Sequence, residues 1–178
     1  MYKQKLGMSV SYDGLPITDL VNLLAKIGFD AISPVWHSEY LEKSVLSAKE
    51  NGLQLQSLHA PFSEIENMWS IDTNLSNSAL NELNIALEDC NKYEIPIMVC
   101  HIWKGFDNLG TPTYAGIENF GKLINKAKEY GIKIAFENTE GEDYLYYLME
   151  NFKGDDTVGF CWDSGHEMCY NDCSLSKR

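Results

Sequence analysis

Apolar residues recur along the chain at intervals of three and four positions, in segments that are each followed by a short apolar run. Leu20 and Leu24 show this spacing, and Leu83 and Leu87 repeat it further along. Such spacing places apolar side chains on one face of a helix, so each segment is expected to bury one face. The pattern predicts five helices, near residues 17–27, 39–51, 76–93, 113–130 and 142–152.

The runs that follow the helices are short and almost continuously apolar, as in "IPIMVCHIW" and "IKIAF". Strands covered on both faces have this composition, and strands that alternate with helices form a parallel sheet with the helices outside. Four predicted helices stop at a glycine suited to a left-handed C-cap, and the other stops before Ile95 and Pro96. The pattern predicts six strands, near residues 6–10, 31–36, 53–59, 95–102, 132–137 and 157–163.

Six βα units fit two architectures, an open doubly wound sheet or most of an eightfold barrel. The segment "SVSYDGLP", at the first predicted strand, carries no GxGxxG or Walker loop, so a nucleotide-binding open sheet loses its main support. No break in composition divides the chain, and residues 1–178 are predicted to form one α/β domain. The longest irregular stretch, from Ser63 to Leu75, is the kind of loop that often carries function.

Composition narrows the classes of function. Hydrophobic residues make up 44% of the sequence, no apolar stretch approaches a membrane span, and the first residues lack a secretory signal. A cytoplasmic protein with no membrane partner is expected. The net charge of -12 repels phosphate backbones, which disfavours a nucleic-acid partner and favours a small molecule. The five cysteines form no CxxC pair, which favours reduced thiols.

Residues that can bind a metal follow four consecutive predicted strands. His59, His101, Glu137 and Asp163 stand at the strand ends, and His166 comes three positions after Asp163. The carboxyl ends of parallel strands meet at one edge, with neighbours about 4.8 Å apart, so these side chains can converge on one ion. An acid that closes a buried strand also costs desolvation energy unless a cation meets it. Imidazole and carboxylate donors suit a divalent ion such as Mn, Zn, Mg or Co.

Other interpretations of these residues stay open. A single histidine at a strand end is more often a hydrogen-bonded structural residue than a ligand. His166, Cys169 and Cys173 could form a small zinc knot, although their spacing is not a standard one and a fourth ligand is lacking. Trp103 flanks a strand end and could stack on a sugar ring or pack in the core.

The segments "SLHAPF", "HIW", "ENTEG" and "CWDSGHEM", in this order, resemble the xylose isomerase-like barrel superfamily, and the similarity spans essentially the whole chain. Its members include sugar phosphate isomerases and epimerases and the endonuclease IV type of DNA repair enzyme. The resemblance implies a TIM barrel in which Glu137 and Asp163 are metal ligands and His166 lies at the metal or the substrate. His59 and His101 match zinc ligands of the endonuclease type, and the matching positions in epimerases more often contact substrate.

The activity that the resemblance implies is metal-dependent isomerisation or epimerisation of a sugar or sugar phosphate through an enediolate. Glu137 is the expected catalytic residue. The expected metal ligands are Glu137, Asp163, His166 and His101, and the expected substrate contacts are His59, Trp103 and Asn138. An endonuclease IV-like phosphodiesterase acting at abasic sites is one alternative. A non-catalytic barrel fragment that binds a metal or a partner is another.

Two features depart from the superfamily pattern. Ser33 stands in the second predicted strand, where the family commonly has a glutamate, and the chain has about six βα units where the family has eight. Such an incomplete barrel would leave its first and last strands as open edges and would lack the family's second glutamate. A homodimer or a complementing C-terminal fragment is therefore expected to cover the edges.

Overall fold

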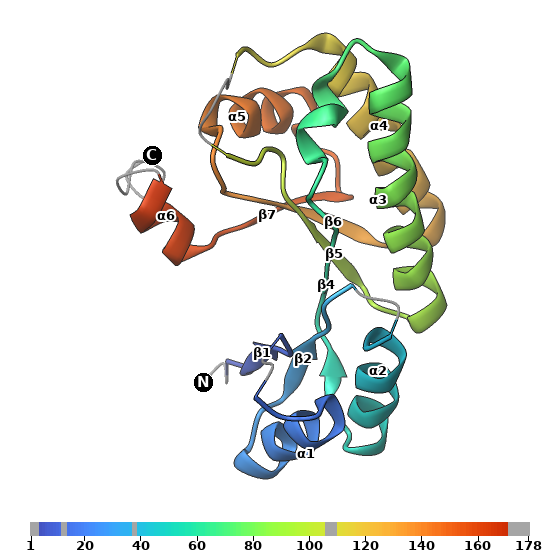
Figure 1. Ribbon diagram of the computed structural model, residues 1–178, viewed down its shortest axis with the longest axis vertical. Coiled ribbons are helices and arrows are strands. Elements are labelled where there is room, and N and C mark those ends of the chain that lie inside the picture. Colours follow the sequence, from blue (N-terminus) through green and yellow to red (C-terminus); the bar gives the residue numbers. More distant parts are fainter. Residues whose placement is uncertain (1–3, 12–13, 37–38, 106–109, 171–178) are drawn as a thin grey trace.

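The structure is a computed structural model that describes residues 4–11, 14–36, 39–105 and 110–170. Strands and helices alternate through these residues, and every pair of neighbouring strands is parallel (Figure 1). The strands form a three-stranded sheet in the order β1-β2-β3 and a four-stranded sheet in the order β4-β5-β6-β7. The predicted parallel α/β architecture is confirmed.

The first sheet and two helices form the lower part of Figure 1. Buried side chains that include Val21, Leu24 and Ile32 make up the small core of this part. Leu20 and Leu24 of the face predicted for the first helix are buried, whereas Ile27 at its end is 60% exposed. The elements are β1 (Gly7–Ser9), α1 (Ile17–Ile27), β2 (Ala31–Ser33), α2 (Leu41–Glu50) and β3 (Gln54–Leu55).

The second sheet carries the larger core, with helices packed against it in the upper part of Figure 1. Its strands are β4 (Leu58–His59), β5 (Ile97–Cys100), β6 (Lys133–Glu137) and β7 (Val158–Cys161). Its helices are η1 (Ile65–Trp69), α3 (Thr73–Tyr93), α4 (Tyr114–Tyr130), α5 (Glu142–Asn151) and α6 (Ser164–Tyr170). Phe120 and Phe136 meet edge to face between α4 and β6, with ring centroids 5.5 Å apart. Figure 1 shows α6 extending beyond β7, away from the other helices.

The two sheets meet where β3 passes into β4. A single bridge pairs Val35 with His59, and the hydroxyl oxygens of Ser33 and Ser57 lie 3.0 Å apart. Leu55 packs against both hydrophobic clusters. Leu41 and Val45 of α2 also belong to the larger cluster, and Trp36 Nε1 donates to Asp89 Oδ2 at 2.8 Å. Buried packing therefore joins the two parts as well as backbone pairing.

The predicted helices all occur, and their ends lie within three residues of the predicted positions. The prediction of one strand over 53–59 is wrong, because this segment is divided into β3 and β4. Two helical elements were not predicted, namely η1 inside the loop from Ser63 to Leu75, and α6 directly after Asp163. The pattern of apolar residues does not reveal the break between β3 and β4, because Gln56 and Ser57 are compatible with a continuous strand.

The end of α3 differs from the other predicted helix ends. Its C-cap is Glu94, which has a φ of 61° and is the one non-glycine residue with positive φ in the described parts of the chain. The backbone N–H of Ile95 then bonds to the Cys90 carbonyl. Pro96 follows two residues later and cannot continue a helix, so the chain turns here although no glycine is present.

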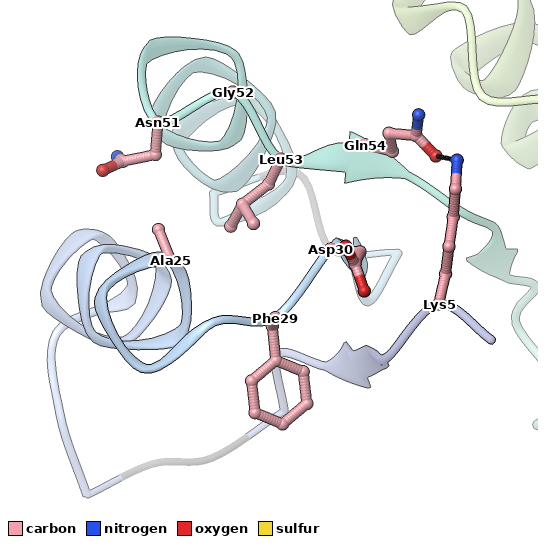
Figure 2. Close-up of a pocket in the computed structure, with 8 residues that line it drawn as sticks. All are labelled: Lys5, Ala25, Phe29, Asp30, Asn51, Gly52, Leu53 and Gln54. Carbon is pink, nitrogen blue, oxygen red and sulfur yellow. Dashed lines mark hydrogen bonds between the residues drawn. The ribbon is translucent and has the colours of Figure 1, made fainter. Parts of the chain in front are cut away.

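A pocket of about 230 Å³ lies at the amino-terminal ends of the first strands, where residues preceding β2 and β3 line it (Figure 2). Lys5 Nζ donates to Gln54 Oε1 across it at 2.7 Å. In parallel α/β folds this end of the strands serves stability, and ligands gather at the other end. None of the helices that the structure describes has both the length and the apolar character needed to cross a membrane.

Candidate metal centre

Glu137, the last residue of β6, lies at the centre of a group of histidines. Its side chain is 7% exposed. Its Oε2 lies 3.1 Å from His101 Nε2 and 3.3 Å from His59 Nε2. Its other oxygen, Oε1, lies 3.7 Å from His166 Nδ1. The carboxyl ends of β4, β5 and β6 therefore bring together three residues that are far apart in the sequence, as parallel strand ends are expected to do.

The surroundings of Glu137 keep its carboxylate charged. Burial would raise the pKa of Glu137, but hydrogen bonds and charge interactions with His101 and His59 lower it to about 2. No lysine or arginine of the described residues forms an ion pair with it, so imidazoles alone face the charge. A buried anion in such surroundings is well placed to receive a cation.

The hydrogen bonds of His59 select the nitrogen that faces Glu137. Its Nδ1 lies 2.9 Å from the carbonyl oxygen of Ala60, and a carbonyl can only accept, so Nδ1 carries a proton. Its Nε2 is then either a second donor to Glu137 or a bare ligand atom. Burial lowers the pKa of His59, but the bonds to Glu137 and Ala60 outweigh this and raise it. A ring nitrogen that donates to a backbone carbonyl while the other faces a carboxylate is typical of metal-binding histidines.

His101 is the most enclosed of the three histidines. The side chain is 10% exposed and directs Nε2 at Glu137, while Nδ1 is buried with no hydrogen-bond partner in the described structure. The ring of Phe62 stacks on its imidazole, with centroids 4.5 Å apart and planes 24° apart. His101 therefore offers one nitrogen to the centre, and an aromatic ring shields its face.

Asn138 and Asp163 hold the second part of the centre in place. Asp163 N donates to Asn138 Oδ1 at 2.6 Å, and Asn138 Nδ2 donates to the Asp163 carbonyl at 2.9 Å. Asp163 Oδ1 in turn accepts from the backbone N–H of His166 at 2.8 Å, which caps the start of α6. His166 Nδ1 lies 3.1 Å from the Asn138 carbonyl and donates to it, and the same nitrogen faces Glu137 Oε1.

These residues form two groups that could each hold a metal ion, and Glu137 belongs to both. One group is His59, His101 and Glu137, the other is Glu137, Asp163 and His166, and the ligand atoms of each lie within 4.8 Å of one another. Donors about 2.1 Å from a tetrahedral ion are separated by roughly 3.4 Å, close to the separations measured around Glu137 Oε2. The donor set therefore fits a divalent ion that accepts nitrogen and oxygen ligands.

The remaining predicted site residues are more enclosed than expected for substrate contacts. Asn138 is fully buried, and both ends of its amide bond to the backbone of Asp163. Trp103 is 9% exposed, its ring stacks on Tyr144 with centroids 4.3 Å apart, and its Nε1 donates to the Gly105 carbonyl at 3.0 Å. Their contact with substrate stays a prediction.

The alternative zinc knot involves a residue outside the described part of the chain, namely Cys173. Of its other members, Cys169 is an exposed free thiol, and His166 Nδ1 is bonded to Asn138. Two residues beside the centre, Phe62 and Lys104, were not predicted from the sequence. The segment "SLHAPF" contained the signal for Phe62, since an aromatic residue three positions after a strand-end histidine can fold back over it.

A model of the xylose isomerase-like TIM barrel family matches residues 21–176 of this chain. Among curated proteins, "Probable endonuclease 4" from Natranaerobius thermophilus is 27% identical over 135 residues. The matched part is 66% of this chain and 44% of that protein, so this chain spans less than half the length of this relative. The family resemblance inferred from the sequence is confirmed.

Solved structures share the fold. D-psicose 3-epimerase, determined in the presence of D-fructose, has a TM-score of 0.74 at 18% identity, covering 95% of this chain and 66% of that chain. The 3-keto-D-glucoside 4-epimerase from E. coli, in its apo form, has a TM-score of 0.75 at 16% identity, covering 98% of this chain and 73% of that chain. At these identities the likeness is one of fold.

Proposed function

This chain belongs to the xylose isomerase-like TIM barrel family, and from that premise we propose that it is a metal-dependent isomerase or epimerase of sugars or sugar phosphates. The ion would be held by Glu137 and Asp163 with His101 and His166. The fold neighbours that are epimerases support a carbohydrate substrate, and the acidic chain supports a small molecule over a polyanion.

The observation that carries the proposal is the buried and ionised carboxylate of Glu137. Its pKa of about 2 means that the charge persists throughout the neutral range. Its neighbour His59 donates its outer nitrogen, Nδ1, to the Ala60 carbonyl, an arrangement that orients Nε2 towards Glu137 as a ligand atom. A scaffold that needed only a stable core would gain more from an apolar residue at this place.

The described residues divide the chemistry among them. When bound, a divalent ion supplies Lewis acidity to the carbonyl and the adjacent hydroxyl of a sugar. Glu137 Oε1, which His59 and His101 do not engage, would accept the proton from the neighbouring carbon. Because the pKa of Glu137 is so low, its carboxylate binds a cation well but accepts a proton weakly. The rate of proton transfer would therefore depend on how acidic the C–H group of the substrate is. His59, with a side chain 33% exposed, would contact substrate oxygens.

Two measurements test this function. Metal content and affinity are measured with Mn²⁺ and Zn²⁺, and proton transfer is followed as deuterium incorporation from D₂O into a panel of ketoses and ketose phosphates. We expect stoichiometric binding of at least one ion, and deuterium at the carbon beside the carbonyl only in its presence. A chain that binds neither ion would overturn the assignment. A chain that binds an ion yet exchanges no deuterium in any sugar would support the non-catalytic alternative.

A second candidate function is phosphodiester cleavage at abasic sites in DNA. It is favoured by the two adjoining ligand groups, which would suit a two-ion hydrolase, and by the similarity to "Probable endonuclease 4". The net charge of -12 opposes DNA binding. Incision of an abasic oligonucleotide in the presence of Zn²⁺, compared with an intact one, distinguishes this function from the first.

A further inference from the structure

Phe62 and Lys104 lie beside the candidate metal centre and have no role in the chemistry described above. The Phe62 ring stacks on His101 at 4.5 Å and meets His59 edge-on at 5.6 Å. Lys104 Nζ lies over the same Phe62 ring, 5.8 Å from its centroid. Together these distances place the ammonium group within about 10 Å of the His101 ring.

Lys104 contacts an aromatic ring, whereas most of the lysines that the structure describes form hydrogen bonds or ion pairs. The others mostly donate to carboxylates, amides or carbonyl oxygens. Lys104 is exposed and forms neither an ion pair nor a side-chain hydrogen bond with any residue in the described ranges. Lys26 and Lys43 also form neither there, but they lie on α1 and α2, in the other part of the fold. Lys104 is therefore a cation at the strand ends whose contact is an aromatic face.

Lys104 is a positive charge beside a centre whose surroundings are mostly negative. The chain carries a net charge of -12, and Glu137 and Asp163 add carboxylates at the site itself. An anionic substrate would meet repulsion from most of this surface, and a local cation offsets it where the charged group docks. A neutral sugar would gain little from an exposed ammonium group, because water solvates that group equally well.

Phe62 supplies an apolar surface beside both Lys104 and the histidines of the centre. Phe62 is 40% exposed although its ring stacks on His101. Aromatic faces in binding sites accept the apolar side of a ligand and leave its polar groups to reach charged residues at the edge. The Phe62 ring therefore contacts both Lys104 and His101, the histidine whose Nε2 faces Glu137.

We propose that Lys104 binds the phosphate group of a phosphorylated sugar that lies across Phe62 and has its carbonyl end at Glu137. Lysine serves as a compact point charge for phosphate, and the position of Nζ suits a group at the far end of a sugar chain. The inference rests on the proposed function and narrows its substrate class from sugars in general to sugar phosphates.

Calorimetric titration of the full chain with D-ribose 5-phosphate and with D-ribose, both with Mn²⁺ present, tests the inference. The two probes differ by the phosphate alone. We expect the phosphate ester to bind roughly tenfold or more tightly than ribose, as one charge-assisted contact allows. Lys104→Ala should abolish most of this preference. Lys104→Arg should retain it, and so should Lys43→Ala, which removes an exposed lysine of α2.

Equal binding of the two probes by the unaltered chain, or an unchanged preference in Lys104→Ala, would overturn the inference. Failure of the phosphate ester to bind would do the same. The proposed function fails in a different way, because it depends on deuterium incorporation. A preference that requires Lys104, found together with no exchange in any sugar, would keep the phosphate subsite and remove the isomerase assignment.

Discussion

The side chain of Asn138 and the backbone of Asp163 are joined by two hydrogen bonds that run in opposite directions. The amide oxygen of Asn138 accepts from Asp163 N at 2.6 Å, and its amide nitrogen donates to the Asp163 carbonyl at 2.9 Å. Only an amide can both accept and donate in this way, so the side chain copies the backbone pairing of a strand. The pair fixes the chain just after β7, where a predicted metal ligand leaves the sheet.

Replacing Asn138 by alanine should loosen Asp163. We expect the free energy of unfolding to fall by about 2–3 kcal/mol, because two part-buried hydrogen bonds of a buried side chain are lost. The affinity for Mn²⁺ or Zn²⁺ should fall by about 10- to 100-fold, as is typical when a group that orients a ligand is removed. Urea unfolding and metal titration measure the two effects. Asn138→Asp keeps the acceptor and loses the donor, so it should lie between alanine and the natural residue in stability.

Replacing Glu137 by glutamine should abolish tight metal binding, with a loss of at least about 100-fold, because both ligand groups share this carboxylate. Without metal, the protein should lose about 1–3 kcal/mol of stability, the range of hydrogen bonds to a charged group. Glu140→Gln, the same change three residues later, is the matched control and should leave metal affinity unchanged. Equal affinities in the two variants would show that the ion binds elsewhere.

The stability of the metal-free protein should depend on pH through Glu137 and His59. The pKa of Glu137 is lowered from 4.5 to about 2, so its contribution is present above pH 4.5 and is lost as pH falls towards 2. The pKa of His59 is raised from 6.5, so its contribution is complete below pH 6.5 and is lost as pH rises through the raised value.

Unfolding in urea at a series of pH values should therefore show greatest stability between about pH 4.5 and 6.5, relative to Glu137→Gln. The difference between the natural chain and the variant should shrink on both sides of this window. A difference that stays constant across the series would contradict the ion pair between Glu137 and His59.

Gly141 should tolerate alanine less well than Gly154 does. Both have positive φ, 80° and 83°, so both substitutions carry a backbone cost of about 1–2 kcal/mol. A methyl group at Gly141 would also lie 2.9 Å from Trp103, whereas the space at Gly154 is open. We expect Gly141→Ala to destabilise by about 1–3 kcal/mol more than Gly154→Ala, in parallel with a changed near-ultraviolet signal from Trp103. Equal effects would mean that Trp103 moves freely.

The sequence allowed the fold to be predicted because each local signal agreed with the tertiary structure. The helix over 17–27 has the predicted bounds, since its apolar spacing and its closing Gly28 select the same segment. The break between β3 and β4 could not be predicted. It arises because β3 pairs in the first sheet and β4 pairs in the second. The local preferences of Gln56 and Ser57 do not indicate this change of partner.

The convergence of His59, His101 and Glu137 was predictable because parallel strands align their carboxyl ends. The finer arrangement was not. Whether Asn138 faces a ligand or the Asp163 backbone depends on where the chain turns after β7, and that turn is set by α6, an element too short for periodicity to reveal. Trp103 is similar, because its burial against Tyr144 depends on the position of α5.

The unequal cores on either side of the join have a consequence for the behaviour of the molecule in solution. The smaller cluster contains residues of α1, of β2 and of neighbouring segments, with Ala48 of α2. The larger one comes mainly from the elements from β4 onward, but Leu41 and Val45 of α2 also belong to it. Every residue of the two ligand groups comes from the second set. Partial opening of β1 and α1, which contribute no residue to the larger cluster, would therefore leave the ion's ligands assembled. Amide protons in β1 and α1 would then exchange with solvent sooner than those beside the ion.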